Sequence, residues 1–292
     1  MKTEEPVRER VPFAARRSWK WSAIGLYALM IVLTIPFLFP SWWMVTSSFK
    51  PLSQVLEFPP TLWPRDFTFD AYAAVFEQPF VLQYWNSLYI AALVTVGTIA
   101  ISAMAGYAFA RIRFPGANLI FVLILVGLML PGEVTIIPLF QLFNGLGLTN
   151  THWPLIIMPM FGASAVMGTF VMRQFFLGIP RELEDAGFVD GLGRFGVFRK
   201  IALPLARPSL AAVAILSFLS SWNAYLEPLV FLSSKDKFTL PLALTQYTDA
   251  IGVPIWNVQQ AAATLTVLPV LLVFIFAQRH FVQGLSQSGI KG

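Results

Sequence analysis

Long and nearly uncharged runs of hydrophobic residues, separated by short polar segments, dominate this 292-residue chain. About 20 apolar residues in a helix cross the ~30 Å hydrocarbon core of a bilayer, and six runs reach that length. They cover roughly Trp21–Phe49, Asn86–Ala110, Ala117–Phe143, Trp153–Phe176, Pro208–Leu232 and Asn257–Gln278. The pattern predicts an all-α, polytopic membrane protein with six transmembrane helices in one domain.

The first run could belong to a cleaved signal peptide or to a retained span. A signal peptide has a shorter apolar core that ends in small residues. This run holds 29 uncharged residues and continues through Trp42 and Trp43. We therefore expect an uncleaved first helix.

Basic residues predict the orientation, because cytoplasmic loops of membrane proteins are enriched in Lys and Arg. With six spans, 16 of the 20 Lys and Arg residues fall on the side of the N-terminus and four on the other side. Both termini are thus predicted to be cytoplasmic, in a cell or inner membrane. Residues 1–20 form the N-terminal segment, residues 21–282 the membrane domain and residues 283–292 the tail.

Prolines fall inside these runs, among them Pro36, Pro138, Pro159 and Pro269. Neighbouring helices and hydroxyl side chains can satisfy the backbone carbonyls that such prolines leave free. The prolines predict bent helices packed in a bundle.

Composition removes several classes of function. Hydrophobic residues make up 57% of the chain and charged residues only 12%, against ~25% in soluble domains. The absence of cysteine excludes disulfides, thiolate metal sites and a cysteine nucleophile. His152 and His280 have no second ligand at metal-binding spacing, so no metal site is expected. The net charge of +5 reflects orientation, and no nucleic-acid partner is expected.

The segment between the fourth and fifth runs, residues 179–210, is too apolar for a solvated tether. Pro180 precedes acids in the first turn of a predicted helix, where the helix dipole favours them. These acids are Glu182, Glu184 and Asp185. Gly191 and Gly193 should end that helix.

A second short amphipathic helix follows, because Phe195, Phe198 and Ile201 recur at helical spacing. Its apolar face needs a partner. The face could lie on lipid headgroups, which nearby basic residues would also suit. Alternatively, it could bind another protein.

The order of residues in this segment resembles the signature loop of permease subunits of bacterial ABC importers. That loop has the pattern E-A-A, three residues, G, nine residues, and then I-x-L-P. The matching residues here are Asp185, Ala186, Gly187, Gly191, Ile201, Leu203 and Pro204. In the family the loop forms coupling helices that dock into a cleft of the ATP-binding subunit. The resemblance implies this role for residues 179–207, with Glu184, Asp190 and Phe195 also taking part.

Two residues depart from the family pattern. Asp185 stands where the family has Glu, and Gly187 stands where it has a second Ala. Gly costs a helix interior roughly 1 kcal/mol relative to Ala, so the first coupling helix should be loosened.

The resemblance extends over nearly the whole chain and is closest to the sugar-importer branch, the type of the second maltose-importer permease. The similar segments are Phe58–Tyr72, Asn86–Leu88, Gly106–Gly116, Leu146–Ile156, Ser221–Leu232 and the tail GLSQSGIKG. This implies the fold of a type I ABC importer transmembrane domain. It also implies a second, homologous permease, two ATP-binding subunits and an external solute-binding protein that contacts Lys50–Trp85 and Ser233–Trp256.

The chain itself carries no P-loop, because none of its seven lysines follows a glycine. We therefore expect a non-catalytic subunit without a cofactor, with ATP and magnesium on the partner ATP-binding subunits.

Carboxylates at membrane depth are costly and are candidates for function. Glu133 and Glu227 are the two found within the predicted helices. In straight helices they would lie roughly 24 Å above Ala117 and roughly 28 Å above Pro208, near the outer surface. A structural role, through Lys235 or water, and a substrate contact both remain open.

Sugars are bound by aromatic stacking and by hydrogen bonds from amides and carboxylates. Trp222, Asn223, Tyr225 and Glu227 carry such groups and are candidates for the substrate path. In a continuous helix Asn223 and Glu227 share a face that excludes Trp222. The alternative for Asn223 is an inter-helix hydrogen bond of ~0.6 kcal/mol.

The predicted function is import of a sugar or oligosaccharide. An importer of a glycerol phosphodiester or other phosphate ester is the first alternative, although no Lys or Arg lies in the central part of any run. An independent secondary transporter should show inverted repeats or midplane ionisable residues, and neither is evident. An intramembrane enzyme would need a catalytic constellation, which is not seen.

Overall fold

The computed structural model describes the backbone of residues 15–288 and the side chains of residues 23–275. Residues 1–14 of the predicted N-terminal segment, residues 289–292 of the tail and the side chain of His280 lie outside this described part. Over the described backbone all regular elements are helices, and the only β-type pairing is an isolated bridge between Thr248 and Pro254. The predicted all-α class is confirmed.

Four helical segments of the described chain are long and apolar enough to cross a membrane, and the number rises to six if two bent pairs each count as one span. The four are α1 (Ala15–Ser47), α4 (Phe80–Arg111), α7 (Trp153–Phe161) with α8 (Ala163–Gly178), and α15 (Trp256–Ser288). The bent pairs are α5 (Ala117–Gly127) with α6 (Gly132–Gly145), and the helix Arg194–Leu205 with α12 (Arg207–Trp222).

The third predicted span is not one straight helix. α5 and α6 meet at an angle of 96°, and Pro131 lies directly before α6. Proline disfavours helical backbone at the residue before it, so the chain turns here rather than at Pro138, which stays inside α6. Glu133 therefore lies in the first turn of α6, exposed and beyond the bend. Its height estimated from a straight helix is wrong.

The fifth predicted span is also interrupted. α12 ends at Trp222, residues 223–225 are not helical, and α13 (Leu226–Phe231) follows. The single helix expected over Pro208–Leu232 is wrong. Two estimates that assumed a continuous helix are therefore also wrong: the height of Glu227, and the helix face that Glu227 was expected to share with Asn223.

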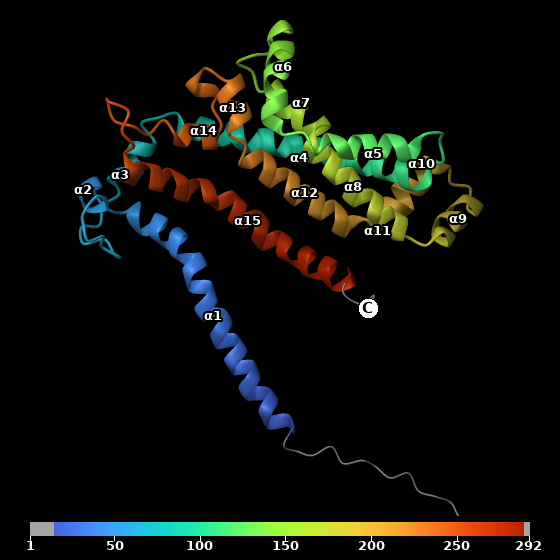
Figure 1. The fold of residues 1–292 in the computed structure, drawn as a ribbon, viewed down its shortest axis with the longest axis horizontal. Coiled ribbons are helices and arrows are strands. Elements are labelled where there is room, and N and C mark those ends of the chain that lie inside the picture. Colours follow the sequence, from blue (N-terminus) through green and yellow to red (C-terminus); the bar gives the residue numbers. More distant parts are fainter. Residues whose placement is uncertain (1–14, 289–292) are drawn as a thin grey trace, which may run out of the picture.

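Helix α4 lies at the centre of the bundle, beside α8, α12 and α7 (Figure 1). Small residues let the helices approach: a Cβ added at Gly106 would lie 2.6 Å from the Cβ of Met172 and 2.9 Å from the backbone nitrogen of Arg173. A Cβ added at Gly168 of α8 would similarly clash with the Oγ of Ser102 on α4. Close packing through small residues is typical of helices in membranes.

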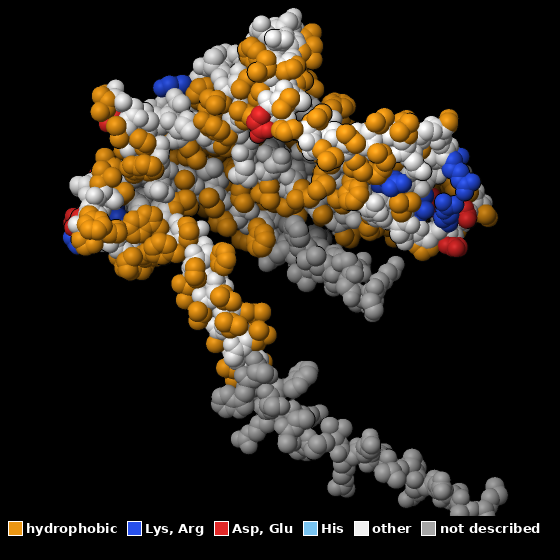
Figure 2. All heavy atoms as spheres, viewed as in Figure 1, with side chains coloured by type: hydrophobic (Ala, Val, Ile, Leu, Met, Phe, Trp, Pro, Cys, Tyr) orange, Lys and Arg blue, Asp and Glu red, His pale blue; other side chains and the backbone are white. Residues whose placement is uncertain are grey.

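Helix α1 leaves the bundle and projects away from it (Figure 1). It packs on α15, and the apolar part of its span has no buried residue. Ile31 and Phe37, for example, are exposed. Figure 2 shows this helix covered with hydrophobic side chains along its described length.

Short helices occupy the two ends of the bundle. At one end lie α2 (Leu52–Val55), α3 (Asp70–Val75), η2 (Lys235–Lys237) and α14 (Leu240–Leu244). At the other lie α9 (Arg181–Val189), α10 (Arg194–Val197), η1 (Phe198–Ala202) and α11 (Leu203–Leu205). Lys and Arg side chains gather at the end that carries α9 and α10 (Figures 1 and 2).

Candidate functional site

The loop between α8 and α12 folds into two short helices, as the sequence predicts. α9 begins after Pro180 with Glu182 and Glu184 in its first turn. It ends before Gly191, whose φ of +83° is a left-handed conformation that suits glycine. A second helical stretch, formed by α10, η1 and α11, then runs into α12 with a bend of 78° at Ala206.

Gly187 lies inside α9 and is buried. A Cβ at this position would lie 2.5 Å from Cδ1 of Ile201 and 3.3 Å from Cγ2 of Val197. The glycine thus lets α9 pack closely against the second helix of the loop. The departure from alanine that appears as a weakness in the sequence has a packing reason.

Glu184 points into the protein and makes the loop's main polar attachment to the bundle. Its Oε1 accepts a hydrogen bond from Nε of Arg111 at 2.7 Å, and each of the two side chains is 7% exposed. Nη2 of Arg111 also donates to the carbonyl of Ile179 at 2.5 Å. The hydroxyl of Tyr107 donates to Oε2 of Glu184 at 3.3 Å. Residues 107 and 111 belong to the last turn of α4, so this network joins α9 to the central helix.

Sequence reasoning included Glu184 but missed Arg111 and Tyr107 as its partners. Both lie in the segment GYAFARIRFPG, which was noted only as part of the resemblance. A basic residue at the inner end of a span is usually explained by orientation alone. The proximity of Glu184 to Arg111 follows only from the folded structure.

The outward face of the loop is unusually apolar. Phe195 is 69% exposed and Val189 is 88% exposed. Leu183, Phe188 and Leu205 are exposed as well. Single exposed apolar residues are ordinary, whereas several together on one loop are typical of an interaction surface.

The other predicted residues of the loop divide between its surface and its interior. On the surface lie Asp185, Ala186, Asp190, Gly191 and Pro204, and half-buried are Ile201 and Leu203. The single apolar face expected for the second helix is split. Phe198 is buried against Tyr107 and Phe176 of the bundle, whereas Phe195 points outward.

A cavity of about 910 Å³ opens in the bundle between α4, the α5–α6 bend, the α7–α8 pair and the α12–α13 break. Ser87 and Ile90 of α4 line one side of it. Its hydroxyl-bearing lining residues are Ser87, Thr135, Ser164, Ser220, Ser221 and Thr239. Glu227 is the one charged residue in the lining, and no Lys or Arg is among the lining residues that are described.

Of the four predicted path residues, only Glu227 lines this cavity. Trp222 is 1% exposed and packs between Phe218 and Tyr84 in the core. The amide of Asn223 is exposed and donates to the carbonyl of Leu219 within its own segment.

Tyr225 is 41% exposed and lies outside the cavity lining. An ion pair between Glu227 and Lys235, one of the alternatives left open by the sequence, is not found among the side chains that are described.

Sequence reasoning missed Ser220 and Ser221 as residues that line the cavity, because small hydroxyl residues are common in membrane helices for packing alone.

A polar clasp closes the opposite end of the bundle. Asn150, at a left-handed φ of 53°, accepts hydrogen bonds at Oδ1 from the backbone nitrogens of Ser233 and Ser234. Asn86 of α4 donates to the carbonyls of Asp236 and Phe238. These contacts explain two of the segments noted for their resemblance, Asn86–Leu88 and Leu146–Ile156.

His152 serves the same clasp, since its ring nitrogens contact the carbonyl of Lys237 and the hydroxyl of Tyr89. No group of ligands able to hold a metal ion is found in the described part of the chain.

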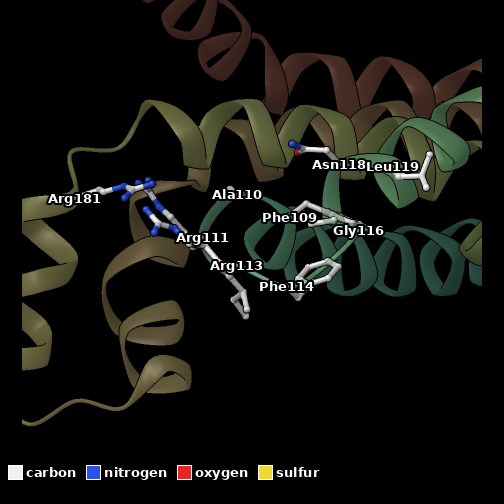
Figure 3. A pocket seen from close by; sticks show the side chains of 11 residues that line it. Phe109, Ala110, Arg111, Arg113, Phe114, Gly116, Asn118, Leu119 and Arg181 are labelled. Atoms are coloured by element: carbon white, nitrogen blue, oxygen red, sulfur yellow. The ribbon is translucent and has the colours of Figure 1, made fainter.

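A second, smaller cavity of about 350 Å³ lies where α4 ends and α5 begins. Three arginines, Arg111, Arg113 and Arg181, contribute to its lining. Figure 3 shows Arg181 extending from α9 toward the end of α4 that carries the other two. The cavity therefore flanks the ion pair between the loop and α4 and concentrates positive charge at this end of the molecule.

Comparison with known proteins identifies the family. The family model described as "Binding-protein-dependent transport system inner membrane component" matches residues 97–287. The chain belongs to this family. The match includes the C-terminal part of α4, the cavity-lining helices from α5 onward and the loop with α9 and α10. The family membership predicted from the sequence is therefore confirmed.

This permease has close relatives of similar length. It is 40% identical over 258 residues to the arabinooligosaccharides transport system permease protein AraQ of Halalkalibacterium halodurans, covering 87% of this chain and 91% of that one. It is 34% identical over 273 residues to the sn-glycerol-3-phosphate transport system permease protein UgpE of Yersinia enterocolitica, covering 91% and 96%.

The fold of this permease has also been seen in a solved structure. A chain of a bacterial ABC transporter involved in the import of the acidic polysaccharide alginate aligns with a TM-score of 0.77 at 23% identity, covering 93% of this chain and all of that one. The fold class of an ABC importer membrane domain is therefore confirmed. The roles of individual residues stay predictions.

Proposed function

We propose that this permease carries a sugar or oligosaccharide, delivered by an external solute-binding protein, across the cell membrane. The lining of the 910 Å³ cavity carries this proposal: six hydroxyl side chains, one carboxylate and no Lys or Arg among its described residues. Hydroxyls and a carboxylate can exchange hydrogen bonds with sugar hydroxyls. The name of the arabinooligosaccharide relative supports the same class of substrate.

The partners follow from the family and from the incomplete site. The cavity is not enclosed by this chain alone, so a second, homologous permease should close it. Two ATP-binding subunits on the cytoplasmic side bind ATP and magnesium and hydrolyse ATP. They receive the exposed apolar face around Phe195 and Val189, together with Asp185, Ala186 and Asp190. Closure of the ATP-binding subunits then moves the loop, and the helices alternate their access.

The orientation of the chain belongs to the same proposal. The loop of residues 179–207 and both termini face the cytoplasm, and the clasp around Asn150 faces outward. The binding protein contacts the segments 50–85 and 233–256. The residues proposed to meet the substrate are Glu227 and its serine neighbours, with Asn223 and Tyr225 at the edge of the break.

Phosphate esters are the second candidate class, because a glycerol-3-phosphate permease is among the relatives. A phosphate dianion needs cationic or amide donors. The described lining of the cavity offers a carboxylate instead, which would repel it. The cavity therefore favours a neutral solute.

The substrate class can be tested in proteoliposomes that contain the complete transporter and its binding protein. ATP-driven uptake of a labelled arabino-oligosaccharide is expected, with little uptake of glycerol 3-phosphate. Glu227→Gln should raise the KM for the sugar about tenfold by weakening a charge-assisted hydrogen bond of 1.5–3 kcal/mol. Glu133→Gln is the matched control, because Glu133 is an exposed carboxylate outside the cavity lining. Equal uptake kinetics in both variants would remove Glu227 from the path.

A further inference from the structure

A buried ion pair joins the coupling loop to the central helix of the bundle. We infer that Glu184 and Arg111 form a mechanical joint, through which movement of α9 is transmitted to α4 and along α4 to the transport cavity. This inference rests on the proposed function and adds to it a route and two positioning residues.

The first step is the attachment of α9 itself. The elements that pack most closely on α9 are α10 and η1, which belong to the same loop. Its connection to a membrane-spanning helix is polar: Glu184 binds Arg111 and Tyr107, and Arg111 also holds the carbonyl of Ile179 just before α9. Arg111 thus holds both the first turn of α9, through Glu184, and the residue segment that leads into α9, through the carbonyl of Ile179.

The second step is the burial of the pair. Only two ion pairs are found among the described side chains, and the other, Arg65–Glu57, is exposed on both sides. A buried pair adds little to net stability because desolvation opposes the attraction, but it strongly penalises geometries that separate the charges. Such a contact suits a joint, since α9 can move only if the end of α4 moves with it.

The third step is the continuity of α4. This helix runs unbroken for 32 residues without an internal proline, whereas the spans on either side of the cavity are interrupted at Pro131 and after Trp222. Ser87 and Ile90 of the same helix line the cavity. Farther along, Gln83 and Asn86 donate to the carbonyls of Lys235 and Asp236 in the outer clasp. A displacement at Arg111 is therefore delivered to the cavity wall and to the outer loop.

The experiment compares Glu184→Gln with Glu182→Gln in the complete, purified transporter reconstituted with its binding protein. Glu182 lies on the same helix but is exposed and makes no ion pair in the described structure, so it is a matched control. The measured quantity is the number of sugar molecules taken up per ATP hydrolysed. We expect a fall of about tenfold for Glu184→Gln and no change for Glu182→Gln, because the loop can still bind the ATP-binding subunits.

A loss of folding alone would lower uptake and ATP hydrolysis together and leave their ratio unchanged, and that result would overturn the joint. If Glu184→Gln does not assemble, Arg111→Lys is measured in its place. Lysine keeps the charge but cannot hold Glu184 and the Ile179 carbonyl with a planar fork. A wild-type ratio in that variant would also overturn the joint. Absence of sugar uptake by the wild-type transporter would instead count against the proposed function.

Discussion

Tyr247, in the segment before α15, is a residue outside the membrane helices whose titration the fold changes. It is 4% exposed, its hydroxyl donates to the carbonyl of Val75, and burial raises the pKa of the phenol to about 12 from its ordinary 10.0. The folded protein thus keeps a proton that the unfolded chain releases. The resulting stability is fully present below pH 10 and is lost as the pH rises from 10 through 12.

This shift predicts a pH dependence that Tyr247→Phe should remove. Two pKa units correspond to about 2.7 kcal/mol, and the wild type in detergent should lose most of this stability between pH 10 and 12. The variant starts about 1 kcal/mol lower, because it lacks the hydrogen bond, but lacks this part of the decline. Thermal unfolding across the pH range measures it, with the exposed Tyr225→Phe as control. Parallel curves for the wild type and Tyr247→Phe would refute the assignment.

At the residue scale the sequence identified the loop but not its attachment. The loop was recognised from the spacing of Glu184, Gly191 and the terminal Leu203-Pro204. Such local spacing can be read from a single sequence. Glu184 and Arg111, in contrast, are 73 residues apart, and no periodicity connects them. The reason for glycine at 187 likewise lies in Ile201, which is brought close by the packing of the two helices of the loop.

At the scale of elements, the crossing of α4 and α8 depends on glycine. A Cβ at Gly106 would meet backbone and Cβ atoms of α8, which cannot rotate away. Gly106→Ala should therefore destabilise the protein by about 1–3 kcal/mol, as overpacking typically does. Gly127→Ala is the control, since nothing lies within 4 Å of a Cβ there. Thermal stability in detergent is the measurement, and similar values for the two variants would contradict close packing at this crossing.

Hydropathy predicted where the membrane helices lie, because about 20 apolar residues must be helical in lipid. It could not predict where they break. Pro138 and Pro159 remain inside helices, while the chain turns before Pro131. The break after Trp222 has no proline at all. Such turns depend on how the neighbouring helices pack. Here the two turns border the 910 Å³ cavity, which hydropathy does not reveal.

For the whole molecule the distribution of charge predicts one orientation, and the absence of native cysteine makes it directly testable. Lys235→Cys and Arg199→Cys place single thiols at exposed positions on opposite ends of the bundle. A membrane-impermeant maleimide should label the first in intact spheroplasts and the second only after permeabilisation. Activity of each variant is the control for folding. The reverse pattern of labelling would invert the proposed topology.

The unbroken length of α4 determines how far its cavity end moves when its other end rotates by a small angle. At 1.5 Å per residue, Arg111 and Ser87 lie about 36 Å apart along the helix axis. A rod of that length pivoting by about 5° at one end displaces the other by about 3 Å, roughly the width of a water molecule. An angular change too small to disturb the packing of the bundle is thus enough to narrow or widen a passage at its far end.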